Sequence, residues 1–314
     1  MPSITRREGL GLALGAAGAF AAGGGAQAQM RLLTRPIPKS GEQLPVIGLG
    51  SSATFSQVAR SEDTAALREV LTTLTSNGGK VFDTAPSYGA SEEVAGKIAR
   101  EAGIADKLFW ATKVNVARGG GAADPAAAKA QIEQSFAKWG QPKIDLIQVH
   151  NVADPPTQLG ILKELKTAGR VRYIGVTSTA EPQYPALMDL MRNEPLDFIG
   201  IDYAVDNREV ESAILPLAAE RKIGVMVYVP FGRTRLFRRV ADRPLPDWAA
   251  DIDARSWAQV FLKWVIGHPA VTVVTPATSR AKNMLDNLGG GVGRLPDQAL
   301  RQRIAEYVAA LPQA

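Results

Sequence analysis

Short apolar runs alternate with longer amphipathic stretches along this chain from about residue 43 onward. An apolar run bounded by turn residues predicts a buried strand, whereas apolar residues recurring every three or four positions predict a helix. The interval after Ser61 has the helical pattern, because one face collects Leu67, Val70, Leu71 and Leu74. Turn residues follow that interval, so we expect a helix that ends before residue 78.

The strand and helix patterns repeat eight times. The predicted strands cover 46–49, 81–83, 108–112, 146–149, 173–176, 198–201, 224–228 and 272–274. Helical stretches near 281–288 and 297–310 close the last unit. Eight such units in roughly 280 residues predict an α/β fold, the (β/α)8 TIM barrel. Because nothing after residue 31 is a linker long enough to divide it, we expect residues 31–314 to form one domain.

A doubly wound open sheet is the alternative fold. The Gly-x-Gly-x-x-Gly fingerprint that would favour it is absent after the first strand, where residues 48–53 are GLGSSA. The barrel is therefore the preferred prediction. Residues 31–43 are expected to form a β-hairpin over the barrel floor.

The first thirty residues have the layout of a signal peptide. Arg6 and Arg7 precede a weakly apolar stretch over 10–22, and Ala26-Gln27-Ala28 offers a cleavage site with small residues. This predicts a twin-arginine-type leader over 1–28 and an exported or periplasmic protein. Gly9 stands where phenylalanine is usual. The alternative is a chance basic start, which would leave the protein in the cytoplasm. The apolar stretch is too short for a stable membrane anchor.

Composition narrows the functional classes. The net charge is +5, but basic residues are scattered among acidic ones, with no basic block interleaved with aromatic residues. We therefore expect no nucleic-acid partner. The chain has no cysteine, which excludes disulfides, a thiolate nucleophile and sulfur-ligated metals. No metal site is predicted.

Reactive side chains follow three successive predicted strands: Asp83 and Tyr88, then Lys113, then His150. In a barrel, residues just past the strands face one shared mouth. A phenol is a weak acid with a pKa near 10, and a neighbouring ammonium should lower that pKa. Tyr88 could then protonate a carbonyl oxygen, with Asp83 pairing Lys113 and His150 orienting the carbonyl.

The other histidine, His268, precedes the last predicted strand. It should therefore lie at the opposite face of the barrel and be structural. Phe55 and Trp248 are candidates for lining an apolar substrate pocket, with core packing as the alternative for both.

The motifs at these strand ends resemble those of the aldo-keto reductases over roughly residues 40–310. They are LPVIGLG at 44–50, FDTAPSYG at 82–89, ATK at 111–113, IDLIQVH at 144–150, GRVRYIGV at 169–176, and the closing Asp286-Asn287. The resemblance implies a (β/α)8 barrel and a catalytic tetrad of Asp83, Tyr88, Lys113 and His150. It also implies reduction of an aldehyde or ketone to an alcohol, with hydride from NADPH or, less often, NADH.

The resemblance also implies a nicotinamide site at the ends of the fifth to seventh strands. Tyr228 would stack on the nicotinamide, with Phe231 in the same segment. Thr177-Ser178 stand where the family usually has Ser-Asn holding the carboxamide, and Gly200 stands where it usually has glutamine.

For the phosphates, the candidates are Arg233 and Arg235 after the seventh strand and Thr278 and Arg280 after the eighth, with Asp286 and Asn287 as further cofactor contacts. Members that prefer NADPH often carry lysine where Ala277 stands. The interpretation favours NADP(H) over NAD(H).

Two other functions remain open. Lys113 could form a Schiff base with a carbonyl substrate, as in a lyase or aldolase, although pairing with Asp83 would keep it charged. Alternatively, the chain could be a non-catalytic binding or sensor protein that retains a nucleotide, a reading motivated by the altered carboxamide positions and the export signal.

Overall fold

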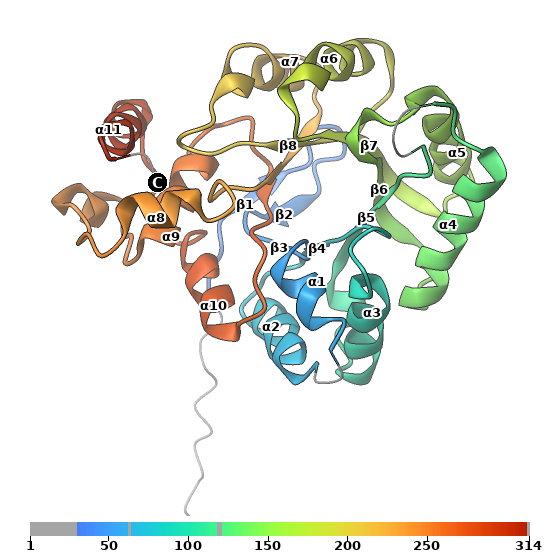
Figure 1. Cartoon of the computed structure of the whole chain (residues 1–314), viewed down its shortest axis with the longest axis horizontal. Coiled ribbons are helices and arrows are strands. Elements are labelled where there is room, and N and C mark those ends of the chain that lie inside the picture. The colour runs from blue at the N-terminus through green and yellow to red at the C-terminus, as the bar shows by residue number, and fades with distance from the viewer. Residues whose placement is uncertain (1–29, 62–63, 118–120, 313–314) are drawn as a thin grey trace, which may run out of the picture.

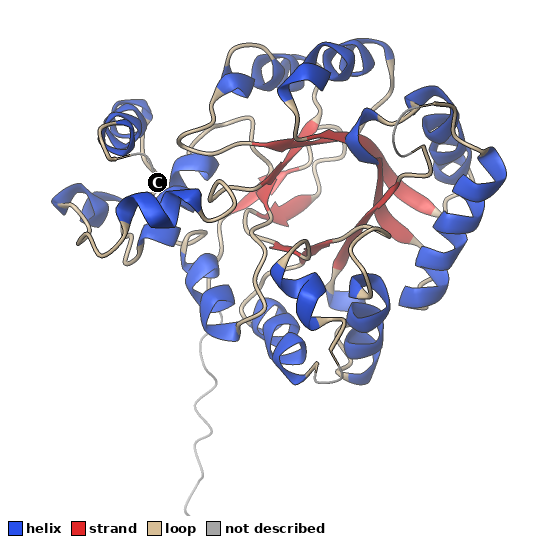
Figure 2. Ribbon diagram, viewed as in Figure 1, coloured by secondary structure: helices blue, strands red, loops and turns tan. Residues whose placement is uncertain are grey.

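Eight parallel strands form the central sheet of the computed structural model, which describes residues 30–61, 64–117 and 121–312. Each strand pairs with the next along the chain, and Figure 2 shows the strands arranged as a ring inside the helices. The strands are β3 (Leu49–Gly50), β4 (Val81–Asp83), β5 (Phe109–Val114), β6 (Ile144–Val149), β7 (Val171–Ser178), β8 (Phe198–Asp202), β9 (Gly224–Tyr228) and β10 (Val273–Val274).

The first and last strands close the ring. The Gly48 amide donates to the carbonyl of Val274 at 2.9 Å, and the Gly50 amide donates to that of Pro276 at 3.1 Å. An isolated parallel bridge also joins Ile47 to Val274. The predicted (β/α)8 barrel is therefore confirmed, and the open doubly wound sheet is not formed.

Helices surround the barrel, as Figure 1 shows. They are α1 (Thr54–Val58), α2 (Ala65–Ser76), α3 (Ser91–Glu101), α4 (Pro125–Trp139), α5 (Pro155–Thr167), α6 (Tyr184–Asn193), α7 (Ile214–Glu220), α8 (Arg235–Val240), α9 (Trp257–Ile266), α10 (Ala281–Gly289) and α11 (Gln298–Ala309). The predicted helix after Ser61 is α2, and it ends before Gly78. Its four predicted core residues, Leu67, Val70, Leu71 and Leu74, are all buried.

The predicted N-terminal hairpin is present. Strands β1 (Thr34–Pro36) and β2 (Gln43–Pro45) pair antiparallel. Ile37 and Leu44 are fully buried and pack with the first residues of two barrel strands, Phe109 and Phe198. Because those residues open β5 and β8, the hairpin covers the amino-terminal end of the barrel. This floor leaves the carboxyl-terminal mouth as the open end.

A buried carboxylate ties the barrel wall to two helices. Glu92 on α3 accepts hydrogen bonds from Thr112 Oγ1 of β5 at 2.8 Å and from Ser135 Oγ of α4 at 2.7 Å. Lys138 of α4 pairs with it at 3.0 Å. A buried charge is tolerated when it is paired and hydrogen-bonded in this way. This contact fixes the wall directly behind Lys113.

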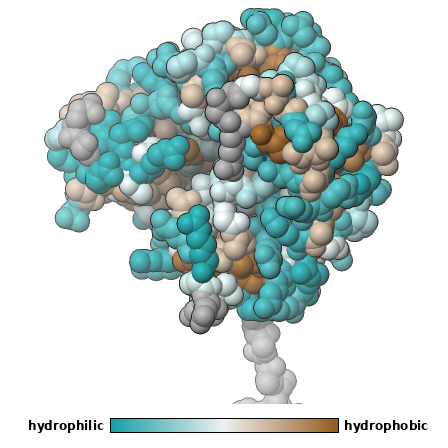
Figure 3. Space-filling view, turned by 45° about the vertical axis from the view of Figure 1, so that its right-hand side comes forward, coloured by the Kyte–Doolittle hydropathy of each residue, from teal (hydrophilic) through white to brown (hydrophobic). Residues whose placement is uncertain are grey.

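The outer surface is mostly hydrophilic on the face drawn in Figure 3, with hydrophobic side chains in small separate patches. Phe237 and Leu285 are the large hydrophobic residues exposed in the described part of the chain. Among those same residues, no helix has the length and apolar character needed to cross a bilayer. The predicted leader over 1–28 lies outside the described residues.

Candidate active site

The four tetrad candidates line one cavity at the mouth of the barrel. Asp83 ends β4, Tyr88 lies in the loop that follows, Lys113 lies in β5, and His150 comes directly after β6. The cavity has a volume of ≈ 530 Å³. The structure thus brings together side chains that lie up to 67 positions apart in sequence (150 − 83). Three neighbouring strand ends account for their convergence.

Lys113 and Asp83 form a buried ion pair at the base of the cavity. The Lys113 ammonium donates to Asp83 Oδ1 at 2.9 Å, to Asp83 Oδ2 at 2.8 Å and to the carbonyl of Thr84 at 2.8 Å. An ammonium has three N–H donors, so all three are used. Burial raises the pKa of the Asp83 carboxyl, and the Lys113 charge opposes that rise. The pair is held rigidly and is shielded from water.

Tyr88 lies beside this pair. The Lys113 nitrogen is 5.4 Å from the centroid of the Tyr88 ring. Burial raises the pKa of Tyr88, while Lys113 acts in the opposite direction. The prediction that the ammonium would lower the pKa of Tyr88 was therefore wrong in its net direction, because desolvation of the phenolate is the larger effect. A raised pKa keeps the hydroxyl protonated at neutral pH, as a proton donor requires.

The imidazole of His150 packs against the same phenol. The two rings are 5.9 Å apart and nearly perpendicular, at 80°. Asn115 Nδ2 lies 3.1 Å from His150 Nδ1. An amide NH2 can only donate, so Nδ1 accepts and the proton is assigned to Nε2. Asn115 was missed in the sequence. Its position two residues after Lys113, on the same side of the strand, is the signal that could have identified it.

Tyr228 at the end of β9 lines the cavity and reaches the ion pair. Its hydroxyl donates to Asp83 Oδ1 at 3.2 Å and accepts from Gln148 Nε2 at 2.9 Å. The Lys113 nitrogen lies 4.9 Å from its ring centroid. The ring occupies the space beside Gly200, where an added Cβ would clash with Tyr228 Cε2. The predicted stacking residue is thus also bonded to the predicted tetrad.

Some of the other cofactor candidates line the cavity, and the rest do not. Thr177, Phe231 and Arg233 line the cavity. Ser178 faces away from it, because its hydroxyl donates to Gln183 Oε1 at 2.9 Å and accepts from the amide of Ala180 at 3.3 Å. Arg235 is engaged elsewhere, since it pairs with both carboxylate oxygens of Asp206 at 2.7 and 2.9 Å.

The remaining candidates lie around α10, outside the set that lines the cavity. Thr278 precedes α10 and accepts a hydrogen bond from the amide of exposed Arg280 at 3.2 Å. Asp286 accepts from Ser256 at 2.8 Å and from Gln259 at 2.8 Å, and so supports the start of α9. Asn287 is buried.

Several cavity residues were not predicted from the sequence. They include Asn151 and Thr179. The amide of Asn151 donates to Thr177 Oγ1 at 3.0 Å. Phe55 and Trp248, proposed above as pocket or core residues, are both buried in the core.

The segment after β9 is strained where it lines the cavity. Val229, Arg233 and Thr234 have φ values of 53°, 51° and 78°. Non-glycine residues rarely adopt this left-handed region, and a β-branched residue there is an outlier. Such strain clusters at binding sites. A valine and a threonine in that conformation make this loop a candidate binding element at the mouth.

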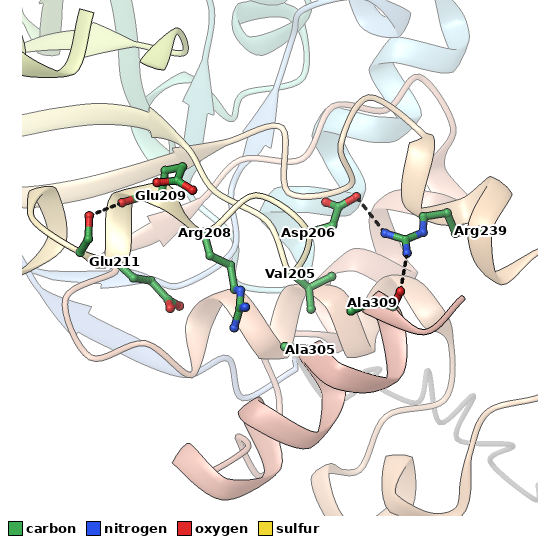
Figure 4. A pocket seen from close by; sticks show the side chains of 9 residues that line it. Val205, Asp206, Arg208, Glu209, Glu211, Arg239, Ala305 and Ala309 are labelled. Atoms are coloured by element: carbon green, nitrogen blue, oxygen red, sulfur yellow. Dashed lines mark hydrogen bonds and ion pairs between the residues drawn. The ribbon is translucent and has the colours of Figure 1, made fainter. Parts of the chain in front are cut away.

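A larger cavity of ≈ 730 Å³ lies away from these residues, between the loop after β8 and α11 (Figure 4). Three of its charged side chains, Asp206, Glu211 and Arg239, are already engaged in ion pairs. Buried Arg239 pairs with Asp206 at 3.7 Å and donates to the carbonyl of Val308 at 2.6 Å, close to the end of α11. Arg239 therefore anchors the last helix. We place the candidate active site in the smaller cavity, where Tyr88 and His150 converge.

Comparison with known proteins agrees with this architecture. The model of the aldo/keto reductase family matches residues 46–304. Aldo-keto reductase str7 of Strobilurus tenacellus is 28% identical over 86% of this chain and 92% of its own length. Aldo-keto reductase YhdN of Bacillus subtilis is 32% identical over 61% of this chain and 60% of its own.

Solved structures give the same fold. An aldo-keto reductase from Klebsiella pneumoniae, in complex with NADPH, superposes with a TM-score of 0.70 at 24% identity, covering 91% of this chain and 98% of its own. The holo form of aldo-keto reductase AKR11C1 from Bacillus halodurans also has a TM-score of 0.70, at 22% identity, covering 88% and 96%. The chain belongs to the aldo/keto reductase family.

Proposed function

We propose that this protein reduces an aldehyde or ketone to an alcohol with NADP(H), and that Tyr88 donates the proton. The observation that carries the proposal is the position of Tyr88, beside a buried Lys113–Asp83 pair at a cavity that His150 also lines. Its raised pKa supports a neutral, proton-donating hydroxyl at physiological pH.

The residues of the cavity fit a dinucleotide. The Tyr228 ring offers a face for the nicotinamide, and Asn151 and Thr177 supply polar side chains beside it. The charge of Arg233 acts on the nearby Asp202 carboxylate, but its guanidinium makes no hydrogen bond or ion pair within the described residues. Because Asp83 already neutralises Lys113, Arg233 is the cavity cation whose N–H donors are open to a phosphate. The NADPH in the Klebsiella pneumoniae relative supports NADP(H) as the cofactor. When bound, that cofactor supplies hydride to the carbonyl carbon.

In this mechanism the protein's residues handle the oxygen. The His150 Nε2–H donates to the carbonyl oxygen and orients it. The Tyr88 hydroxyl then transfers its proton to that oxygen as negative charge develops. The Lys113 ammonium stabilises the resulting phenolate by charge alone, because its three N–H groups stay hydrogen-bonded to Asp83 and to the Thr84 carbonyl.

The direct test uses purified protein with NADPH or NADH and a panel of aldehydes and ketones. We expect loss of reduced-nicotinamide absorbance with at least one carbonyl, and tighter binding of NADPH than of NADH. Arg233→Gln should weaken NADPH binding roughly tenfold, the loss expected for a charged hydrogen bond. Arg303→Gln, exposed on α11, is the matched control and should leave the binding constant unchanged. Absence of both turnover and nucleotide binding would refute the proposal.

A nucleotide-retaining protein without reductase activity is the second candidate. It is favoured by one observation: Ser178 faces Gln183, and position 200 has no side chain, so neither can hold a carboxamide. Tight NADPH binding with no turnover of any carbonyl would select this function. The Schiff-base function has no such support, because the Lys113 nitrogen is buried and donates all three protons.

We propose further that the leader over 1–28 exports the folded, cofactor-loaded protein to the periplasm by the twin-arginine route. The sequence motif and the absence of cysteine support this. Arg6→Lys/Arg7→Lys should retain the protein in the cytoplasmic fraction of a bacterial host. Native mass spectrometry of the exported protein should find the nucleotide bound. Unchanged export of the double variant would contradict the route, and an empty exported protein would contradict preloading.

A further inference from the structure

The Tyr228 hydroxyl sits inside a directed chain of hydrogen bonds. Gln148 is fully buried on β6, and with its amide assigned so that Nε2 faces the hydroxyl, it donates to that oxygen at 2.9 Å. The hydroxyl proton is therefore available to an acceptor, and Asp83 Oδ1 lies 3.2 Å away. The sulfur of Met226, at 3.4 Å, is the weaker alternative acceptor. A carboxylate is the preferred partner because a charged acceptor roughly doubles the strength of the bond.

This bond completes the fixing of the Asp83 carboxylate. Lys113 donates to both carboxylate oxygens, from β5 on one side. Tyr228 donates to Oδ1 from β9, on the opposite wall of the barrel. Two donors from opposite sides define the plane of the carboxylate. Because Asp83 accepts two of the three hydrogen bonds that Lys113 donates, the orientation of that plane helps to set where the ammonium lies relative to Tyr88.

The absence of a side chain at Gly200 leaves the space in which the Tyr228 ring lies, and this placement lets its hydroxyl reach Asp83. A Cβ at position 200 would clash with Tyr228 Cε2 and would lie 2.9 Å from Tyr228 Cζ and from Thr177 Cγ2. Real Cβ atoms do not approach other atoms so closely, so any side chain here would displace the ring. The glycine on β8 and the amide of Gln148 on β6 therefore both serve the deep placement of one phenol.

We propose, resting on the carbonyl reduction proposed above, that Tyr228 is a positioning residue whose hydroxyl orients Asp83 and thereby aligns Lys113 with Tyr88. Its ring and its hydroxyl then have separable roles: the ring lies against the nucleotide, and the hydroxyl maintains the proton-donating pair. The charged or titratable groups facing Asp83 are Lys113 from β5, Tyr228 from β9 and Tyr88 from the loop after β4.

Tyr228→Phe tests this separation, because it keeps the ring and removes the hydroxyl. We expect kcat to fall roughly tenfold or more, the loss of one hydrogen bond to a charged group. The dissociation constant for NADPH, measured by protein fluorescence, should change by less than about twofold, within the scatter of such contacts. Asp83 loses a donor that favours its charged form, so its pKa should rise and the acid limb of the kcat pH profile should move to higher pH.

The matched control is Tyr173→Phe. Tyr173 also donates its hydroxyl to a carboxylate, that of Glu42 at 2.6 Å, but at the floor of the same barrel. It should leave kcat and the pH profile unchanged. Gly200→Ala should instead displace the ring, so that NADPH binding and kcat fall together. If Tyr228→Phe fails to fold, Gln148→Met removes the amide donor while keeping Tyr228, and should move the same pH limb by a smaller amount.

A readout independent of turnover separates this inference from the proposed reaction. The carboxyl ¹³C resonance of Asp83, assigned with Asp83→Asn, should titrate at a higher pH in Tyr228→Phe than in the wild type. Wild-type protein that reduces no carbonyl would defeat the proposed reaction, and the Asp83 titration would still decide the role of the hydroxyl. Identical Asp83 titrations, or an unchanged kcat and pH profile in Tyr228→Phe, would overturn the inference.

Discussion

The two ends of the barrel use similar residues in opposite ways. At the floor, Tyr173 donates to Glu42, and the Arg35 guanidinium donates to the carbonyls of Ile266 and Val271 at 2.6 and 2.7 Å. At the mouth, Lys113 and Asp83 are equally well bonded, but Tyr88 beside them lines a cavity. Both ends therefore hold tyrosine and charged groups in hydrogen-bonded sets, with Arg35 and Glu42 half-buried and Lys113 and Asp83 fully buried.

The two ends differ in what their hydrogen-bonded groups contact: other protein groups at the floor, and a cavity at the mouth. Floor groups donate to protein acceptors, and Ile37 fills the space that remains. At the mouth, the ion pair instead acts on a phenol that faces space large enough for a ligand. A charged group held in a hydrogen-bonded set is thus a poor mark of function by itself. A buried ion pair next to a cavity-lining acid is the better mark, and the two ends should respond differently to substitution.

The largest expected effect is at the mouth. Tyr88→Phe removes the proton donor but leaves the cavity walls in place. Carbonyl reduction should fall by roughly 10²–10⁴-fold, the usual contribution of general acid catalysis. NADPH binding and the thermal midpoint should change little. Steady-state kinetics with a fluorescence titration checks this, and a Phe variant within tenfold of wild-type kcat would remove Tyr88 from the role of acid.

Lys113→Met breaks the ion pair and should affect both activity and stability. It leaves the Asp83 carboxylate buried without its cation, which typically costs about 3–5 kcal/mol. Urea denaturation measures the loss. Asp83→Asn/Lys113→Met removes the stranded charge and should recover part of that stability without recovering activity. A double variant no more stable than Lys113→Met would contradict this account of the pair.

Arg35→Met is the corresponding change at the floor. It leaves backbone carbonyls of the segment from Ile266 to Val271 without their donor, so the free energy of unfolding should fall by roughly 1.5–3 kcal/mol. The folded fraction should retain wild-type kcat, because the floor does not reach the cavity. A selective fall in kcat at unchanged stability would show that the two ends are coupled.

Lys263 on α9 should have an effect that is visible only in alkaline solution. Its ammonium donates to the carbonyls of Val292 and Arg294, and burial lowers its pKa from 10.5 to about 8. Between those values the unfolded chain keeps a proton that the folded protein has released. The free energy of unfolding should therefore rise with pH in this window, by at most about 1.4 kcal/mol per pH unit.

Thermal unfolding of the wild type and Lys263→Met, compared at about pH 8 and about pH 10, checks the sign. The wild type should gain stability relative to the variant as the pH rises. A difference between the two proteins that is constant across this range would show that Lys263 is not the titrating group.

Much of the fold could be predicted because its signals are local. Each strand is a short apolar run, and Asp83, Lys113 and His150 are separated from such a run by at most one residue. The eightfold alternation followed from the same patterns. Once a barrel is predicted, pairing between its first and last strands, such as that of Gly48 with Val274, is implied, since a barrel must join those strands.

The contacts within the site were harder to predict because they depend on where side chains point. Ser178 and Thr177 are neighbours in β7, so one faces the cavity and the other cannot. Arg235 follows β9 closely in sequence, which suggested that it would face the cavity. In the structure it instead forms an ion pair with Asp206, which belongs to a different loop. The net direction of the Tyr88 pKa depended on the degree of burial, which no sequence pattern reports. Tyr228 reaches Asp83 across the barrel, 145 positions away.

The seam that closes the barrel has a consequence for how the ring opens. The joined strands, β3 and β10, have two residues each, whereas β7 has eight. The cavity lies against this seam, since Gly50 lines it from one side and Thr275 and Ala277 from the other. The amides of Gly48 and Gly50 should exchange hydrogen with solvent earlier than those of β5 to β7. A molecule bound in the cavity would contact both β3 and the segment after β10. It would therefore stabilise the closed barrel at its shortest strand pairing.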